Sequence, residues 1–274
     1  MKNFKRILAL VMALVMAFAL CACSDKANDD AKTETASDLD YIKANGKMVI
    51  GYTDYAPMNY FEDDEFVGFD TDFAKAVCEK LGVEPDFIEI NWDTKEVELN
   101  AKSIDCIWNG FTITDERKEN IEFSKPYIEN KQVVVIKQAN KDKFTDTASL
   151  AAANLVAEVS SAGESAIADD ENLSKANYVA VQKQTDGLLE VKAGTADAVV
   201  LDYTLAYAMV GEGTDYEELM IIDGLDLCVE NYGIGFRKGS DAAKAVDAII
   251  DELLADGTLE AIADKYDLGA ILVK

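Results

Sequence analysis

The stretch that organises this chain is IWNGFTITDER, residues 107–117. The apolar run Ile104–Trp108 predicts a buried strand, and Asn109-Gly110 ends it with residues typical of turns. Thr114 then suits the N-cap of a short helix, whose first residues are acidic as the helix dipole favours. The pattern therefore predicts a strand that runs through an exposed turn into a helix.

Three residues of this stretch have the chemistry of a carboxylate-binding site. Gly110 lets a ligand approach the backbone, Thr112 has a hydroxyl, and Arg117 has a planar set of donors that suits a carboxylate. Alternatively, Arg117 is a solvated residue of the first helical turn and pairs with Glu116 or Glu119. The stretch alone leaves both interpretations open.

Composition excludes several classes of function. The chain has 274 residues, enough for one large or two small domains, and a net charge of -26, which repels phosphate backbones. Nucleic acid is therefore not expected as a partner. Histidine is absent, which removes Ser-His-Asp and Cys-His catalysis and metal sites built on histidine.

The N-terminal residues predict export. A basic start is followed by the apolar run Ile7–Leu20, which is too short to span a bilayer comfortably and is typical of a secretory signal. The following Leu20-Cys21-Ala22-Cys23 resembles a bacterial lipobox, so residues 1–22 would be removed and Cys23 lipidated. An ordinary signal peptide cut near Ala22 is the alternative. A lipidated Cys23 anchors the protein to a membrane without crossing it.

Residues 23–38 are expected to form a lipidated flexible tether, because they are polar and acidic and have no apolar periodicity. Cys78 lies on a predicted helix face and Cys106 in a strand that this helix covers. They form either a disulfide or two buried thiols.

Two sets of alternating strands and helices follow, separated by the polar segment 137–146. This alternation predicts two α/β lobes. The expected strands are residues 47–51, 85–90, 104–108, 132–136, 155–159, 178–181, 197–201 and 228–236, and helices are expected from 70, 94, 148, 161, 186 and 204.

Several residues at expected strand ends have two interpretations each. Asp70 is read as a helix N-cap. Trp92 is either a lid over a ligand or ordinary core. Ser161 either binds an anion at a helix start or simply caps that helix, and Asp202 either meets a cation or caps the next helix.

From Asp40 to its end the chain resembles the family 3 solute-binding proteins of polar amino-acid ABC importers. The matching motifs occur in the family's order: Gly51 with Pro57; GFDTD at 68–72; Ile104-Asp105; GFTIT at 110–114 with Arg117; FSKPY at 123–127; SAGE at 161–164; GTADAVV at 194–200 with Asp202; YGIG at 232–235; and Lys238-Gly239.

The resemblance implies an α/β fold of the two-lobed, periplasmic-binding-protein-like type II, with two crossover hinge strands. Residues 39–131 plus 228–274 would form lobe 1, and residues 132–227 lobe 2, with the crossings near 132–136 and 225–234. Closure of the lobes over a ligand needs only a few hinge residues to change conformation.

The resemblance also implies the ligand contacts. Arg117 would hold an α-carboxylate, helped by backbone N–H groups of Gly110 and Thr112, the Thr112 hydroxyl and Ser161, and Asp202 would hold the α-ammonium. Both charges need partners because an uncompensated buried charge is costly. The remaining implied contacts are Tyr55 and Trp92 as aromatic walls, with Asn109 and Asp54 as weaker candidates for polar contacts.

The chain departs from the family pattern at three places. Ser160 replaces a frequent glycine, and Ala162 replaces a frequent hydroxyl, so the contacts of residues 160–163 stay open. The first loop is one residue shorter than in many relatives, which leaves open whether Thr53 or Asp54 faces the ligand.

The expected function is that of a receptor, not an enzyme, that binds an amino acid and delivers it to the permease subunits of an ABC importer. It would be a monomer without cofactor or metal, held at the extracellular face of the bacterial membrane through Cys23 alone. The alternative is an enzyme like the cyclohexadienyl dehydratases, for which Glu158, Glu164 and Lys183 are the candidate proton-transfer groups. Which amino acid binds is not determined by the sequence.

Overall fold

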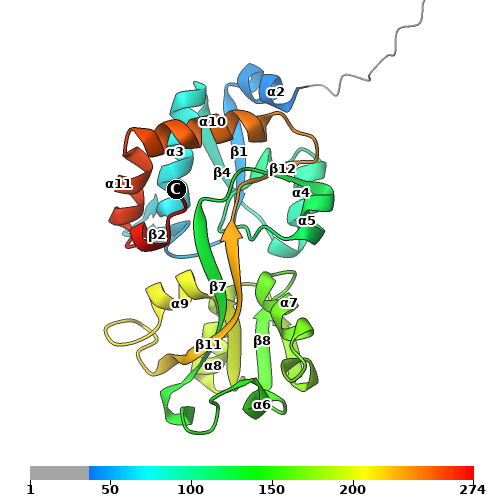
Figure 1. The fold of residues 1–274 in the computed structure, drawn as a ribbon, viewed down its shortest axis with the longest axis vertical. Helices are drawn as coiled ribbons and strands as arrows, with labels where there is room; N and C mark the ends of the chain where they lie inside the picture. Colours follow the sequence, from blue (N-terminus) through cyan, green and yellow to red (C-terminus); the bar gives the residue numbers. More distant parts are fainter. Residues whose placement is uncertain (1–36) are drawn as a thin grey trace, which may run out of the picture. The chain divides into compact units, whose positions relative to one another are not determined.

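The computed structural model describes residues 37–274, which belong to one compact unit that spans Ala36–Lys274. Two five-stranded sheets and a two-stranded hairpin carry its architecture (Figure 1). The predicted lipidation site Cys23 and most of the predicted tether lie outside the described residues. No helix within 37–274 is long and apolar enough to cross a membrane.

The first sheet has the strand order β4-β1-β5-β12-β6. Its strands are β4 (Glu84–Glu89), β1 (Lys47–Tyr52), β5 (Cys106–Ile107), β12 (Gly235–Arg237) and β6 (Ile121–Phe123). The helices of this part are α2 (Asp38–Asn45), α3 (Phe69–Leu81), α4 (Lys95–Asn100), α5 (Asp115–Asn120), α10 (Ala242–Ala255) and α11 (Thr258–Lys265), and β2 (Tyr60–Glu62) pairs with β3 (Glu65–Val67). β1 runs parallel to β4 and β5, whereas β12 runs antiparallel to its neighbours.

The second sheet has the order β11-β7-β10-β8-β9. Its strands are β11 (Leu219–Tyr232), β7 (Ile128–Lys137), β10 (Ala198–Asp202), β8 (Asn154–Glu158) and β9 (Asn177–Val181), and its helices are α6 (Thr147–Leu150), α7 (Ala162–Asp169), α8 (Gln184–Ala193) and α9 (Tyr203–Met209). Short 3-10 turns lie at η1 (Trp92–Thr94), η2 (Gln138–Asn140), η3 (Leu173–Lys175) and η4 (Gly269–Ile271).

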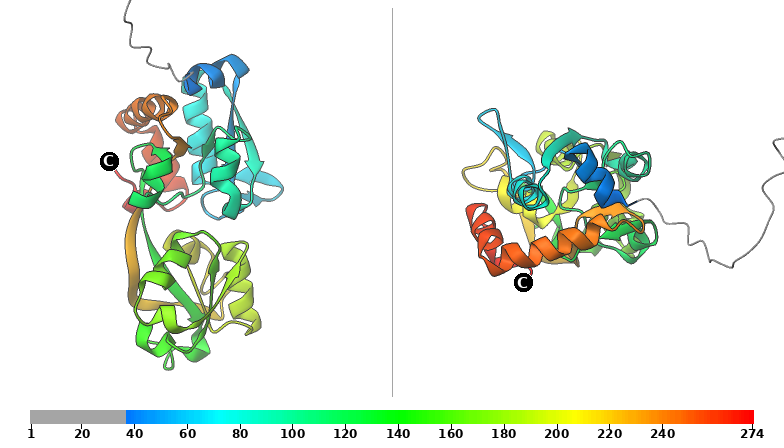
Figure 2. Two further views of the ribbon diagram at one scale, coloured as in Figure 1. Left: turned by 90° about the vertical axis from the view of Figure 1, so that its right-hand side faces the viewer. Right: turned by 90° about the horizontal axis from the view of Figure 1, so that it is seen from above.

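Two long strands connect the sheets. β7 and β11 pair antiparallel from Ile128↔Tyr232 to Lys137↔Leu219, and Figures 1 and 2 show them side by side between the two parts. Ile128 also bridges to Leu272 in the first part, whereas Val133 to Ile136 pair with β10 in the second. The register shifts near Asp226, so the pair is irregular where it enters the second sheet.

The predicted two-lobed α/β fold is confirmed. Because each lobe alternates strands with helices, both sheets are covered by apolar helix faces. α3, for example, buries Phe69, Phe73 and Val77 and ends at Gly82, whose left-handed conformation follows the prediction from glycine chemistry. The lobe boundaries at 131/132 and 227/228 stay a prediction.

Two local predictions are wrong. The N-cap of α3 is Gly68, and Asp70 is a fully buried residue of the first turn. Its Oδ2 accepts hydrogen bonds from Gly110 N (2.7 Å) and Tyr127 Oη (3.0 Å), which are distant in sequence and do not belong to its own helix. The strand expected at 104–108 is shortened to Cys106–Ile107. The open question about Cys78 and Cys106 is answered by two buried free thiols.

Candidate functional site

A small chamber lies where strands of both sheets end. The loops after β1, β4 and β5 meet the ends of β8, β9 and β10, in agreement with the rule that open α/β sheets bind ligands at the carboxyl ends of their strands. The chamber residues are Tyr55, Trp92, Asn109, Gly110, Thr112, Arg117, Glu158, Ser161, Ala162, Gln184 and Asp202. All eight predicted ligand-binding residues are among them, brought together from positions 55 to 202.

Arg117 reaches the chamber from the first turn of α5. Thr114 caps this helix as predicted, since its Oγ1 accepts a hydrogen bond from Arg117 N (3.1 Å). The guanidinium donates to Thr112 O (2.8 Å) and to Ser160 O (3.2 Å) and lies 4.7 Å from the centre of the Phe111 ring. It therefore faces the other lobe and does not pair with Glu116 or Glu119.

Asp202 lies opposite, at the end of β10. It occupies the N-cap position of α9, as one interpretation expected, but its side chain makes no capping hydrogen bond. Its Oδ1 accepts hydrogen bonds from Asn130 Nδ2 (2.6 Å), Gln132 Nε2 (2.9 Å) and Tyr232 Oη (2.7 Å). Its Oδ2 accepts one from Gln184 Nε2 (2.5 Å).

A second carboxylate, Glu230, shares these donors. Its Oε1 accepts hydrogen bonds from the same amides of Asn130 (2.6 Å) and Gln132 (2.9 Å). Burial, with the neighbouring Glu230 next, raises the pKa of Asp202 above its ordinary value. Two carboxylates held together in this way favour either a shared proton or a nearby cation.

Three predicted contacts are engaged differently from what the resemblance implies. The Gly110 N–H is directed to Asp70, and the Thr112 hydroxyl donates to Glu230 Oε1 (3.1 Å), so neither points to a ligand carboxylate in this conformation. The Asn109 amide is fully used within lobe 1, where it bonds Thr53 and Asn59. Asn109 thus holds the first loop in place while it lines the chamber.

Aromatic side chains close two sides of the chamber. Tyr55 Oη lies 2.5 Å from Thr204 Oγ1 of α9 and 2.6 Å from Tyr232 Oη, so it bridges both lobes. Trp92 is 6% exposed, packs edge-on against Phe111 at 5.5 Å, and lies under the Lys95 ammonium at 4.8 Å. Of the first-loop alternatives, Thr53 is buried against Asn109 and Asp54 is exposed, and neither lines the chamber.

The loop at residues 160–163 touches lobe 1. Ser160 has a left-handed backbone (φ +57°), and its carbonyl accepts hydrogen bonds from both Lys95 (3.0 Å) and Arg117 (3.2 Å). Ser161 caps α7 by accepting from Glu164 N (3.1 Å), which leaves its hydroxyl proton free for a ligand. The serine in place of a frequent glycine thus keeps the glycine-like conformation.

Three further chamber residues, Glu158, Ala162 and Gln184, were not among the predicted ligand contacts. Glu158 ends β8 and was considered only as a proton-transfer group, and Gln184 opens α8 after β9. Gln184 was detectable as a polar residue in the loop region that follows a predicted strand, between that strand and the next helix. Glu158 was harder to find, because a carboxylate inside an apolar strand has no local signal of what it faces.

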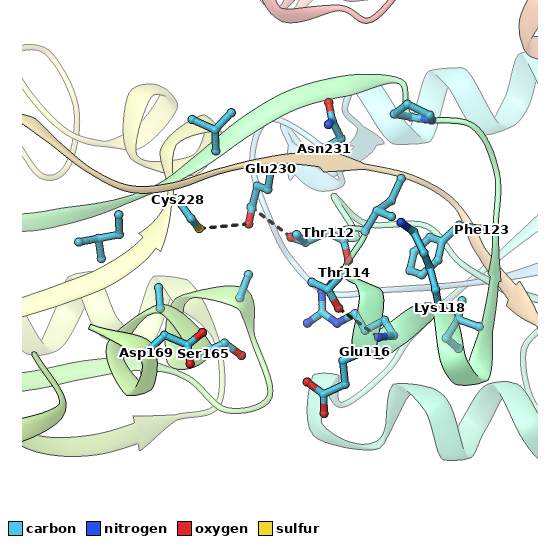
Figure 3. A pocket seen from close by; sticks show the side chains of 18 of the residues that line it. Thr112, Thr114, Glu116, Lys118, Phe123, Ser165, Asp169, Cys228, Glu230 and Asn231 are labelled. Carbon is cyan, nitrogen blue, oxygen red and sulfur yellow. Dashed lines mark hydrogen bonds between the residues drawn. The ribbon is translucent and has the colours of Figure 1, made fainter. Parts of the chain in front are cut away.

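The chamber is enclosed and small, with a volume of about 10 Å³, room for about one water molecule. Beside it lies a wider groove of about 1170 Å³ between α5, α7 and β11, which opens to solvent. Figure 3 shows this groove, with Glu230 of β11 hydrogen-bonded to Thr112 and Cys228. An amino acid fits the chamber only after the lobes or the side chains between them separate.

Comparison with known proteins then decides the family. Residues 48–270 match the bacterial extracellular solute-binding proteins, family 3. The chain belongs to this family. The predicted resemblance is thereby confirmed.

Relatives within the family are named as binding proteins. The ABC transporter glutamine-binding protein GlnH of Bacillus subtilis (strain 168) is 30% identical, with 93% of this chain and 95% of that protein covered. The L-cystine-binding protein TcyJ of Escherichia coli (strain K12) is 27% identical, with coverages of 86% and 88%. These names describe binding proteins and not enzymes.

Solved structures of amino-acid-binding proteins agree with the fold. A mutant of ArgBP from T. maritima shares 31% identity with a TM-score of 0.77, covering 84% of this chain and 98% of that one. The ancestral amino acid-binding protein AncCDT-1, described as a precursor of cyclohexadienyl dehydratase, shares 29% identity with a TM-score of 0.76, covering 84% and 99%.

Proposed function

We propose that this protein is a receptor that binds an α-amino acid in the chamber between its lobes and delivers it to the permease of an ABC importer. The observation that carries the proposal is that Arg117 from lobe 1 and Asp202 from lobe 2 line the same enclosed chamber. A zwitterionic amino acid has a carboxylate for Arg117 and an ammonium for Asp202. Because both charges are buried on binding, each needs an opposite charge. Relatives named for glutamine, cystine and arginine binding support an amino-acid ligand.

The roles of the chamber residues follow from this placement. Arg117 would exchange its carbonyl partners for the α-carboxylate, with the Ser161 hydroxyl as a second donor. Asp202 would receive the α-ammonium. Tyr55 and Trp92 would pack against the ligand side chain, and Asn109, Gly110 and Thr112 would shape the wall on the lobe 1 side.

The lobe division is part of the proposal. Residues 39–131 and 228–274 would move against residues 132–227 about β7 and β11, whose irregular register near Asp226 supports a change of backbone conformation there. Contacts across the chamber, such as Lys95 to Ser160 O, would be replaced by contacts through the ligand.

The place of action rests on the N-terminal sequence. A signal sequence over residues 1–22 and lipidation of Cys23 would hold the protein at the outer face of the cell membrane, close to its permease. Replacing Cys23 with Ser should release the protein into the medium, which fractionation of cells measures; retention in the membrane fraction would contradict lipid anchoring.

The experiment that tests binding is a thermal-shift screen of the purified protein against the common amino acids and cystine. A ligand at 100 times its Kd adds about 2.7 kcal/mol of stability, which raises Tm measurably. A shift with one or a few α-amino acids is expected. The absence of any shift would contradict the amino-acid assignment.

The dehydratase alternative is not favoured. An additional acid in the chamber would be needed for it, and Glu158 is such an acid, so the chamber alone does not separate the two functions. The named relatives favour the receptor, since their names describe binding proteins and not enzymes. Incubation with prephenate or arogenate should give no aromatic product.

A further inference from the structure

Glu158 is an acidic residue of the chamber that the binding of a zwitterion does not use. It ends β8, is 3% exposed, and lines the chamber. Within residues 37–274, no hydrogen bond or ion pair reaches its carboxylate, although its neighbours Arg117 and Asp202 are both well bonded. An ionised carboxylate buried without partners is costly, so the conformation described here favours the protonated form of Glu158.

The charged groups around Glu158 do not compensate the cost of burying its ionised carboxylate. Asp202 and Asp186 are acidic neighbours, and Lys95 and Lys183 are basic ones. The Lys183 ammonium pairs with Glu89 across the lobes at 2.6 Å. The Lys95 ammonium is held by the carbonyls of Trp92 and Ser160, each at 3.0 Å. Both nearby cations therefore have other partners.

We propose that the solute is an α-amino acid whose side chain ends in a cation, and that Glu158 selects for this cation. This inference rests on the proposed function. Once Arg117 binds the α-carboxylate and Asp202 the α-ammonium, Glu158 is the remaining chamber group that lacks an opposite charge. The faces of Trp92 and Tyr55 add to the same preference, because aromatic rings attract cations.

Binding of such a ligand should be linked to proton release. Burial, with Asp202 next, raises the pKa of Glu158 to about 8, so at neutral pH the unliganded carboxyl holds a proton. A cation favours the ionised form, and the proton leaves to solvent on binding. Affinity for the cationic ligand should therefore rise with pH up to about 8, and a neutral ligand of the same shape should lack this part of the pH dependence.

Titration calorimetry with arginine and its neutral isostere citrulline, and with lysine and norleucine, tests the proposal. We expect the cationic member of each pair to bind about 10- to 100-fold more tightly, as for hydrogen bonds to charged groups. Glu158→Gln keeps the shape and removes the charge, so it should bring the ratio of arginine affinity to citrulline affinity near one. Glu171→Gln, at an exposed site outside the chamber, is the matched control.

Runs in two buffers of different ionisation enthalpy measure the protons released. Arginine should release more protons than citrulline in the wild type and the same number in Glu158→Gln. Tighter binding of citrulline, glutamine or cystine than of arginine and lysine would overturn the inference, as would an unchanged ratio in Glu158→Gln. Both results leave the proposed function standing, whereas failure of every α-amino acid to bind would overturn the proposed function itself.

Discussion

The Arg117 side chain donates hydrogen bonds to two backbone carbonyls, packs on the face of an aromatic ring and lines the chamber. The carbonyls satisfy the guanidinium without neutralising it, which leaves its charge available for a carboxylate. Its planar donors also set the direction from which a ligand can approach.

Replacing Arg117 with Ala should weaken binding of every amino acid by at least about 30-fold, because loss of one partner of a buried charge pair costs about 2–5 kcal/mol. Titration calorimetry measures this. Lys118→Ala removes an exposed charge of the same helix and should leave affinity unchanged. A ligand-specific loss in Arg117→Ala would contradict a role at the shared α-carboxylate.

Asp70 should make the unliganded protein less stable as pH rises. Burial raises the pKa of this carboxyl to about 7, against about 4 in the unfolded chain, so folding takes up a proton between these values. The stabilisation is complete below about pH 4 and is lost by about pH 7, at up to about 1.4 kcal/mol per pH unit.

Urea unfolding at pH 5, 6, 7 and 8 measures this dependence. Asp70→Asn cannot ionise, so its free energy of unfolding should fall less steeply with pH than that of the wild type, by that slope. The other titrating groups contribute equally to both proteins and cancel in the comparison. Parallel profiles for the two proteins would show that Asp70 does not change its protonation on folding.

At the scale of an element, α5 depends on its cap. The helix has six residues, too few to be stable without tertiary support, and Thr114 bonds the backbone N–H of Arg117 itself. The residue that starts the helix therefore also positions the residue that faces the chamber.

Thr114→Ala should cost about 1 kcal/mol of folding stability and also reduce affinity, because the loss of the cap frees the turn that carries Arg117. Thr114→Ser keeps the hydroxyl and serves as the control. Urea unfolding and calorimetry on the same samples give both quantities. Unchanged affinity despite the loss of stability would show that the Thr114 cap does not position Arg117 for binding.

At the scale of the whole molecule, the two tryptophans report on different parts. Trp92 lines the chamber between the lobes, whereas Trp108 is fully buried against Phe73 in lobe 1. The proposed opening and closing of the lobes would change the surroundings of Trp92 and not those of Trp108.

Ligand addition should therefore change the intrinsic fluorescence of the wild type and of Trp108→Phe, and leave that of Trp92→Phe nearly unchanged. A fluorescence titration with a ligand from the thermal screen measures this. A full signal in Trp92→Phe would place the conformational change elsewhere in the molecule.

Much of this architecture was readable from local patterns. The alternation of strands and helices, the glycine at the end of α3, the Thr114 cap and the side chains that follow each strand are set by residues near one another in the chain, so the sequence alone determined the two-lobed fold. The resemblance to the family 3 solute-binding proteins, carried by motifs along the chain, also implied eight of the eleven residues that line the chamber.

Tertiary structure alone decided what those side chains do. Asp70 and Asp202 stand where caps are expected, yet Asp70 bonds a loop forty residues away and Asp202 meets donors from β7, β11 and α8. The Asn109 amide is consumed by Thr53 and Asn59. Glu158 lost its water when β8 was buried. Hydrogen-bond partners and desolvation depend on contacts between segments that are distant in sequence, so a local sequence pattern does not predict them.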